Sequence, residues 1–558
     1  APTENATNPE TGWPPPAMEP LLNPPLKGEG KWVTIAGFPF VIQNPGAPVP
    51  FVVSFIRSDR KRIYSQVFVT LWDPRQVELN TVSGTVEPQS ATGATGTGIV
   101  PRDPRVLSRF VGAFNGGFQA VHGEFGMMAD RVVYLPPKPY AATVAKLDDG
   151  ATGFGTWPEN LAVPEQIVSY RQNMTSLIEG DQINPFKRHW WGGVPPGWTE
   201  ESRTVRSGLC MTREGFVGYF YGPSVDPEVL ALAMQRARCT YGVHLDMNAG
   251  HTGLEFYRVG RSGTLPKPER NLQELWEARG SVPDAPGWEF MGRRMIKYMA
   301  LMNFPRYVNT EARDFFYLTL RHLLPGDPVE PVLVPAEEGE GAWRTHGLPQ
   351  HGWPHAVATT NIRPDAERPY TRVGLIKLDP KFVRVERLGD PTSSRVIEFR
   401  SVVVEAPLML WHAPSAGFVI AELPPVAGAM RISGGFAPSA PEAPRAQAAL
   451  GVDRAGMLLY ARVTEGPAPG RDAALLIALL ERLGCEQKLL LPRPLGAIFG
   501  EREEPAVAPT AVGAAAPAID RVRLVRAEGP TARRIFPDTP IVLPKRWAPL
   551  QQKRVRYK

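Results

Sequence analysis

The second half of this chain repeats part of the first half, and this repeat constrains the fold more than any other feature of the sequence. The dipeptide Asp73-Pro74 recurs 306 positions later as Asp379-Pro380, and four nearby identities keep the same spacing without a gap. These identities are Arg62 and Arg368, Tyr64 and Tyr370, Val67 and Val373, and Val77 and Val383. Self-similarity at a fixed spacing indicates repeated architecture, so we interpret it as an internal duplication.

Length and composition agree with more than one domain. The chain has 558 residues, of which 43% are hydrophobic, so it is too long for one ordinary domain and can fill two or more cores. We expect an extended N-terminal arm at residues 1–30, a first copy at 31–265, a helical connector at 266–330, a reduced second copy at 331–503, an Ala/Pro linker at 504–518 and a basic tail at 519–558.

The local pattern of the first copy is typical of alternating strands and helices. Short apolar runs bounded by Gly and Pro predict strands at residues 51–56, 66–72, 209–211, 216–221 and 243–245. Before the last of these, Asp226 can cap a helix that begins at Pro227. In the connector, residues 271–279 and 309–324 also match helices. The predicted fold class is therefore α/β, with mixed sheets and packed helices.

Two glycine-bearing segments, about 130 residues apart, mark the candidate site. The first is Phe114-Asn115-Gly116-Gly117-Phe118, and the second runs from Leu245-Asp246 to Thr252-Gly253. Each follows an apolar stretch, so each is expected where a buried strand ends and the backbone turns tightly. Between them lies Arg203-Thr204-Val205-Arg206. Strand ends of this kind place polar side chains at the mouth of a site.

In order and spacing, these segments resemble the motifs of the phosphodiester glycosidase family, over roughly residues 31–265. Members of that family show an Asn-Gly-Gly-Phe-Phe motif, an Arg-Thr step before a strand and a late Leu-Asp-Gly-Gly-Gly-Ser motif. This chain departs from the last motif, where Met247, Asn248, Ala249 and His251 replace the family residues. The resemblance implies the family's fold and a hydrolase of glycosyl phosphodiesters.

Cleavage between an anomeric carbon and a phosphate passes through a cation-like sugar and releases a good leaving group. Such a reaction needs one carboxylate and some cations rather than two carboxylates. Asp246 is the leading carboxylate, as a base toward water or a stabiliser of the sugar cation, and Glu124 is the second candidate. Arg203 and Arg206 can bind phosphate oxygens in bidentate fashion.

The remaining candidates would bind substrate. Asn115 can hydrogen-bond a sugar hydroxyl or a phosphate, Gly116 and Gly117 allow close backbone approach, and Thr204 belongs to the Arg-Thr step. His251 is either a phosphate-facing group or a structural loop histidine. Plainer alternatives stay open for all of them: a turn-capping carboxylate, strand-edge arginines and a turn-forming Asn-Gly-Gly.

The second copy lacks most of these residues. Ser433 stands where the first copy has Asn115, and Pro492-Arg493-Pro494 stands where Asp246 is expected. We therefore expect the second copy to keep the sheet and to have lost the site.

Three cysteines, Cys210, Cys239 and Cys485, are too few for a disulfide scaffold. Cys210 and Cys239 are close enough in the chain to pair in an oxidising compartment, and buried free thiols are the alternative. The start at Ala1-Pro2 carries no signal-peptide pattern and fits a mature chain after signal removal. We expect a secreted or periplasmic protein of bacterial type.

Several classes of site and segment are not indicated. The sequence contains no dinucleotide fingerprint, Walker loop, nucleophile-elbow serine or zinc-finger spacing, so we expect no cofactor. His346, His351 and His355 are separated by Pro349 and Pro354, which excludes one helical face and argues against a metal. No apolar run approaches the roughly 20 residues that cross a bilayer, so no transmembrane segment is expected.

Positive charge is concentrated near the C-terminal end. The net charge is +6, and residues 519–558 alone carry eleven Lys and Arg against three Asp and Glu. This tail could bind an anionic polymer, or it could be a solvated tail or a charged edge strand. No nucleic acid partner is expected.

Three functions follow from these observations. The first is a secreted hydrolase of glycosyl phosphodiesters in a surface polysaccharide or glycolipid. The second is a noncatalytic surface or assembly protein on a degenerate glycosidase scaffold, whose extended termini pair between subunits of a homo-oligomer. The third is a carbohydrate-binding module without hydrolysis.

Overall fold

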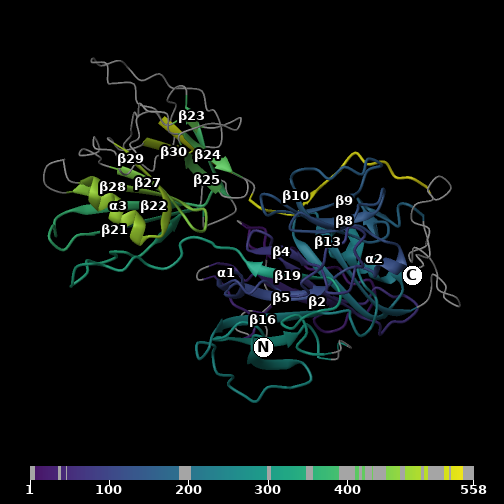
Figure 1. Ribbon diagram of the computed structural model, residues 1–558. Coiled ribbons are helices and arrows are strands. Elements are labelled where there is room, and N and C mark those ends of the chain that lie inside the picture. Colours follow the sequence, from purple (N-terminus) through teal and green to yellow (C-terminus); the bar gives the residue numbers. More distant parts are fainter. Residues whose placement is uncertain are drawn as a thin grey trace. The chain divides into compact units, whose positions relative to one another are not determined.

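The chain forms two compact units (Figure 1). Unit 1 consists of Ala1–Asn8, Gly12–Arg321 and Pro530–Lys558, and unit 2 of Pro9–Thr11 and His322–Gly529. The computed structural model describes residues 7–9, 11–35, 39–44, 47–187, 203–297, 299, 303–346, 356–388, 409–413, 417–421, 430–431, 448–465, 472–491, 496–499, 521–526 and 529–543.

The fold is nearly all β, so the predicted α/β class with packed helices is wrong. Among the described residues, strands hold 36% and helices only 7%, which leaves too few helices there to cover the sheets. In the described parts of the chain, strand pairs are antiparallel except β30 with β31 and β32 with β9. Antiparallel neighbours are joined by hairpins and need no crossover helix, whereas parallel neighbours do.

The helices predicted in the connector are also wrong. Residues 277–281 form strand β17 (Glu277–Ser281), and residues 315–320 form strand β19 (Phe315–Leu320). All of β19 is buried. A short, fully buried apolar run looks the same in a strand and in a helix, so periodicity alone could not separate the two.

Within its described residues, unit 1 contains three sheets and three short helical segments. The eight-stranded sheet has the order β1 (Val33–Thr34), β2 (Phe51–Ile56), β3 (Val67–Trp72), β14 (Val217–Val225), β13 (Thr204–Thr212), β15 (Cys239–His244), β11 (Ile178–Glu179), β12 (Gln182–Ile183). The second sheet has the order β17, β18 (Trp288–Arg294), β16 (Leu254–Arg261), β5 (Phe110–Asn115), β19, β4 (Val77–Val82). The third has the order β32 (Arg533–Arg534), β9 (Thr152–Thr156), β8 (Ala142–Leu147), β10 (Ile167–Gln172), β6 (Met127–Ala129), β7 (Val132–Leu135). The helical segments are α1 (Pro104–Leu107), the 3-10 turn η1 (Ala120–His122) and α2 (Pro227–Arg236).

The eight-stranded sheet and the β5 sheet share one apolar core. The ring of Phe114 on β5 lies 5.8 Å from Trp72 and 5.0 Å from Tyr219, which belong to the opposite sheet. On its own sheet it stacks 5.2 Å from Phe316. This packing holds the end of β5 against strands β13 and β14.

Helix α2 covers the other face of the eight-stranded sheet. The Asp226 side chain accepts a hydrogen bond from the backbone N–H of Val229 at 2.9 Å, and Pro227 takes the first helical position. The predicted helix start is therefore confirmed. Leu230 and Met234 are fully buried in the cluster between the helix and the sheet.

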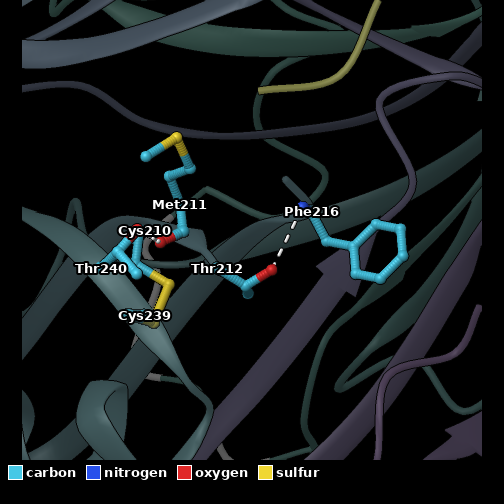
Figure 2. Close-up of a disulfide and its surroundings, with 6 residues drawn as sticks. All are labelled: Cys210, Met211, Thr212, Phe216, Cys239 and Thr240. Atoms are coloured by element: carbon cyan, nitrogen blue, oxygen red, sulfur yellow. Dashed lines mark hydrogen bonds between the residues drawn. A yellow bond between two sulfur atoms is a disulfide. The ribbon is translucent and has the colours of Figure 1, made fainter. Parts of the chain in front are cut away.

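A disulfide joins strands β13 and β15 (Figure 2). Cys210 and Cys239 have Cα atoms 5.8 Å apart, within the usual range for a disulfide, so of the two alternatives the structure shows the pair. Beside it, the backbone N–H of Phe216 donates to the Thr212 hydroxyl at 3.1 Å (Figure 2). Cys485 is buried and free.

Parts of both terminal segments pack within unit 1. In the segment expected to be an extended arm, Trp13 is 2% exposed and its ring lies 4.7 Å from Phe216. In the basic tail, Arg533 and Arg534 form ion pairs at 2.6 Å with Asp149 and Glu179. The linker at 504–518 and residues 544–558 lie outside the described residues. In the described part of the chain, no helix is long and apolar enough to span a membrane.

Unit 2 is built around one six-stranded sheet with a single helix packed on it, within its described residues. Its order is β20 (Arg344–His346), β21 (Val357–Ile362), β22 (Arg372–Leu378), β28 (Leu458–Glu465), β27 (Ala448–Asp453), β29 (Cys485–Leu491). The helix is α3 (Asp472–Arg482). Two further three-stranded sheets have the orders β23 (Val383–Leu388), β31 (Arg521–Arg526), β30 (Gly496–Phe499) and β25 (Gly417–Ala421), β24 (Met409–Ala413), β26 (Met430–Arg431).

The main sheets of the two units have the same order of elements. Strands β2-β3-β14-β13-β15 correspond to β21-β22-β28-β27-β29, and β2 and β21 start 306 positions apart. Both units interrupt the register at the same place, where Thr212 faces Cys239 and Asp453 faces Cys485. Cys485 is thus the counterpart of Cys239, and Gly451 is the counterpart of Cys210. Ser433 and Pro492-Arg493-Pro494 lie outside the described residues.

This correspondence predicts that Gly451→Cys will form a second disulfide, with Cys485. A Cβ atom built on Gly451 would lie 2.6 Å from the Cys485 sulfur and 3.0 Å from its Cβ, so the two side chains face each other, and the strands must separate slightly to reach the roughly 3.5–4.5 Å between Cβ atoms that disulfides adopt. The bond should raise the unfolding free energy of unit 2 by up to about 3 kcal/mol. Thiol counting by mass spectrometry and thermal unfolding, with and without reductant, test this. Two free thiols in the folded variant would contradict the correspondence, and Gly451→Ser is the control for the added side chain.

Candidate active site

Asn115, at the end of β5, joins the β5 sheet to the eight-stranded sheet. Its side-chain oxygen accepts hydrogen bonds from the Tyr219 hydroxyl at 2.8 Å and from the backbone N–H of Gly253 at 3.0 Å. Its side-chain nitrogen donates to the Ser207 hydroxyl at 3.0 Å. Asn115 is 4% exposed, so its side chain is occupied within the protein and organises the site rather than reaching into solvent.

The two glycines after Asn115 make room for a buried ion pair that the sequence did not reveal. Arg171 and Asp314 are paired at 2.8 Å, and the backbone N–H of Gly117 donates to the same carboxylate at 3.1 Å. A Cβ atom on Gly116 would lie 1.9 Å from an Asp314 oxygen, and one on Gly117 would lie 2.7 Å from the Arg171 guanidinium. Both positions therefore require glycine.

Asp246 follows β15 and lies directly against the Asn115 segment. Its backbone N–H donates to the carbonyl of Gly116 at 2.9 Å, which joins the two motifs that are far apart in the sequence. One carboxylate oxygen accepts backbone N–H groups of Met247 and Asn248, and the other accepts Arg313 Nη1 at 2.7 Å. Burial raises the pKa of Asp246, whereas the Arg313 guanidinium acts to lower it.

The Asp246–Arg313 pair lies at the border between core and solvent. The two side chains are 9% and 16% exposed, and the loop residues Asn248 and Ala249 are exposed. Within the described residues, the remaining N–H groups of Arg313 have no hydrogen-bond partner. A ligand at this border would meet one carboxylate and one arginine.

Arg206 and His244 lie behind the loop and are fully buried. The Arg206 guanidinium is 3.3 Å from His244 Nε2 and donates to the carbonyl of Val225 at 2.8 Å. Burial lowers the pKa of Arg206 to about 9, and burial together with Arg206 lowers the pKa of His244 well below its usual value. Arg206 therefore stabilises the loop from inside instead of facing a ligand.

His251 is held by a second arginine. Arg306 Nη2 lies 2.5 Å from His251 Nδ1, and the same guanidinium is paired with Glu311. Burial and the charges of Arg306 and Arg313 lower the pKa of His251 to about 4, so the ring is neutral at pH 7. His251 is half-buried at the same loop as Asp246.

Three predicted residues are not part of this cluster. Arg203 forms ion pairs with Asp59 at 2.5 Å and with Asp226 at 2.9 Å, so its charge is neutralised near the start of α2. The nearest recorded partner of Glu124 is Lys138, at 3.9 Å. Thr204 pairs in register with Val225, at the beginning of β13.

The structure adds residues that the sequence did not indicate as functional, above all Arg313 and Arg306. Both lie in the segment expected to be helical, and neither belongs to a recognisable motif. In the described residues no group of three or more His, Cys, Asp and Glu side chains could hold a metal ion. His351 and His355 lie outside the described residues.

A cavity of about 520 Å³ in unit 1 lies elsewhere. Its lining comes from residues between 35 and 50, from the segment 266–272, and from strands β16, β17 and β18. None of the predicted site residues lines it.

Comparison with known proteins gives only distant likenesses. No family model and no curated protein matches the chain. The catalytic domain of zebrafish N-acetylglucosamine-1-phosphodiester alpha-N-acetylglucosaminidase, auto-inhibited by its pro-peptide, is 12% identical over 51% of this chain and 87% of that chain, with a TM-score of 0.29. A hypothetical protein from Synechocystis is 11% identical over 50% and 64%, with a TM-score of 0.26. A putative exported protein from Burkholderia pseudomallei K96243 is 10% identical over 38% and 70%, with a TM-score of 0.16.

Buried Glu255, on β16 beside the site, predicts a pH-dependent stability of unit 1. Burial raises its pKa from 4.5 to about 7, although Tyr257 and the Arg306 N–H donate hydrogen bonds to it. Folding thus favours the protonated carboxyl group of Glu255. Its contribution to the free energy of unfolding is complete below pH 4.5 and is lost as the pH rises through about 7. The loss should be about 3 kcal/mol, and Glu255→Gln should remove it.

Urea unfolding of unit 1 at pH 5 and pH 8 tests this, with the variant compared with the parent at each pH. Glu289→Gln, on neighbouring β18 and partly exposed, is the matched control and should keep the full pH dependence. Equal pH dependence in the parent and in Glu255→Gln would show that Glu255 titrates normally.

Proposed function

We propose that the protein is a hydrolase of glycosyl phosphodiesters, with its site at the Asp246–Arg313 pair. The observation that carries the proposal is the hydrogen bond between Asp246 and Gly116, because it joins the two motifs that resemble the phosphodiester glycosidase family. The departures at Met247 to His251 lie in the exposed loop and do not break this contact.

In this proposal the roles differ from those inferred from sequence. Asp246 acts as a base toward water or stabilises the sugar cation, since its buried position raises its pKa. Arg313 takes the role first given to Arg203, because its free N–H groups can bind phosphate oxygens next to the carboxylate. The neutral His251 accepts from Arg306 at Nδ1, so its Nε2–H can donate one hydrogen bond at the same border.

One arrangement favours a noncatalytic surface or assembly protein as the second candidate. Both oxygens of Asp246 are already hydrogen-bonded within the protein, and Arg203 and Glu124 have other partners. In that case the Asp246–Arg313 pair only stabilises the conformation of the loop at residues 246–253. Pairing of terminal segments between subunits would then supply the function.

Two further proposals concern origin and location. The common strand order of the two units supports an internal duplication. The Cys210–Cys239 disulfide supports folding in an oxidising compartment, as for a secreted or periplasmic protein.

Hydrolysis of a nitrophenyl sugar phosphodiester by the full chain tests the hydrolase proposal. Asp246→Asn should reduce turnover by about 10³-fold, because the variant keeps the backbone hydrogen bonds but loses the carboxylate charge. Arg313→Gln should also reduce turnover. Arg203→Gln and Glu124→Gln are the matched controls and should leave it unchanged. Equal turnover in Asp246→Asn would exclude this site, and no turnover by the parent, together with concentration-dependent oligomers, would favour the assembly protein.

A further inference from the structure

One face of the unit 2 sheet carries a polar groove of about 330 Å³. Strands β20, β21, β22 and β28 form its floor, and residues 337–342 form one side. The opposite face of the same sheet packs against α3 through an apolar cluster. In unit 1, the eight-stranded sheet packs against α2 on one face and against the β5 sheet on the other. The groove of unit 2 lies on the face that corresponds to the second of these.

A row of directly paired residues shows how the two faces differ. In unit 1 the row across β2, β3 and β14 is Phe55, Phe68 and Tyr221. In unit 2 the row across β21, β22 and β28 is Asn361, Gly374 and Arg462. Directly paired residues point to the same side of a sheet. Where unit 1 has three aromatic side chains, unit 2 thus has an amide, a glycine without a side chain, and a guanidinium.

Gly374 makes the hollow between Asn361 and Arg462. A Cβ atom there would lie 3.3 Å from a methyl group of Thr464 and 3.4 Å from Asn361 Oδ1, so a small side chain would fill the space. Glycine in the middle of a strand weakens it and often marks a place where a ligand approaches the backbone closely.

Two arginines of the groove lack carboxylate partners in the described part of unit 2. Arg462 lines the groove, and its Nε is buried without a hydrogen-bond partner. The Arg344 side chain is exposed and forms no ion pair or hydrogen bond with the described residues. The other arginines are neutralised: Arg363 pairs with Glu340 and Arg372 with Glu337, each at 2.7 Å. Because no carboxylate of the described part of unit 2 pairs with Arg462 or Arg344, an anionic group in the groove can form charge-assisted hydrogen bonds with their guanidinium groups.

We propose that this groove binds an acidic sugar, one carboxylate-bearing ring of a polysaccharide. Arg462 binds the carboxylate, Arg344 on the outer strand β20 binds the carboxylate of a neighbouring ring, and the Asn361 amide bonds a ring hydroxyl beside the hollow left by Gly374. The volume is within the range of small-ligand sites. This binding does not depend on hydrolysis at Asp246, because the groove belongs wholly to unit 2.

Calorimetric titration of the full chain with trigalacturonate at low salt tests the proposal. Arg462→Gln and Arg344→Gln should each weaken binding by about tenfold, the effect of one charge-assisted hydrogen bond, and Arg462→Lys should recover part of it. Gly374→Val should abolish binding by filling the hollow with a residue that suits a strand. Arg454→Gln, an exposed charge of the same unit, and Asp246→Asn should bind as the parent does.

Competition identifies the ligand chemistry. The neutral maltotriose should not bind, and inorganic phosphate should not displace trigalacturonate at equal concentration. Displacement by phosphate would make the groove a simple anion site and overturn the sugar assignment. Absence of trigalacturonate binding, or equal binding by Arg462→Gln with unit 2 folded, would overturn the site itself.

Discussion

The structure of unit 1 depends on the hydrogen-bonding needs of one buried amide. Asn115 belongs to the β5 sheet, but its partners Ser207 and Tyr219 belong to the opposite sheet. A buried polar group must be satisfied, and an unmet donor or acceptor there costs about 1–3 kcal/mol. The amide therefore fixes the register between the sheets, and through Gly253 it also fixes the loop that carries Asp246.

Charge pairing around this amide divides the arginines of unit 1 into two groups. Arg171, Arg203 and Arg306 each have a carboxylate partner in the protein, so their positive charge is largely used for stability. Arg313 is paired as well, but its remaining N–H groups have no partner among the described residues. A ligand can therefore bind Arg313 with little further desolvation of the guanidinium group, which favours a catalytic or binding role for this arginine.

The two units have the same strand order in their main sheets but different side chains on one face of the sheet. Where unit 1 needs aromatic residues to fill a sandwich core, unit 2 has Asn361, Gly374 and Arg462 on the same positions. The strands persist because the opposite, helix-covered face remains apolar in both units. The proposed sugar groove uses this polar row of unit 2.

The sequence by itself determined the features that depend on neighbours along the chain or on a fixed spacing: the offset between β2 and β21, the α2 start at Asp226-Pro227, and the turns after Asn115 and Asp246. It could not decide between strand and helix for 315–320, because a fully buried run has no distinguishing period. It also could not show that Arg313, rather than Arg203, meets Asp246. Ion-pair partners are chosen by distance in space, and only the packing of the two sheets sets that distance.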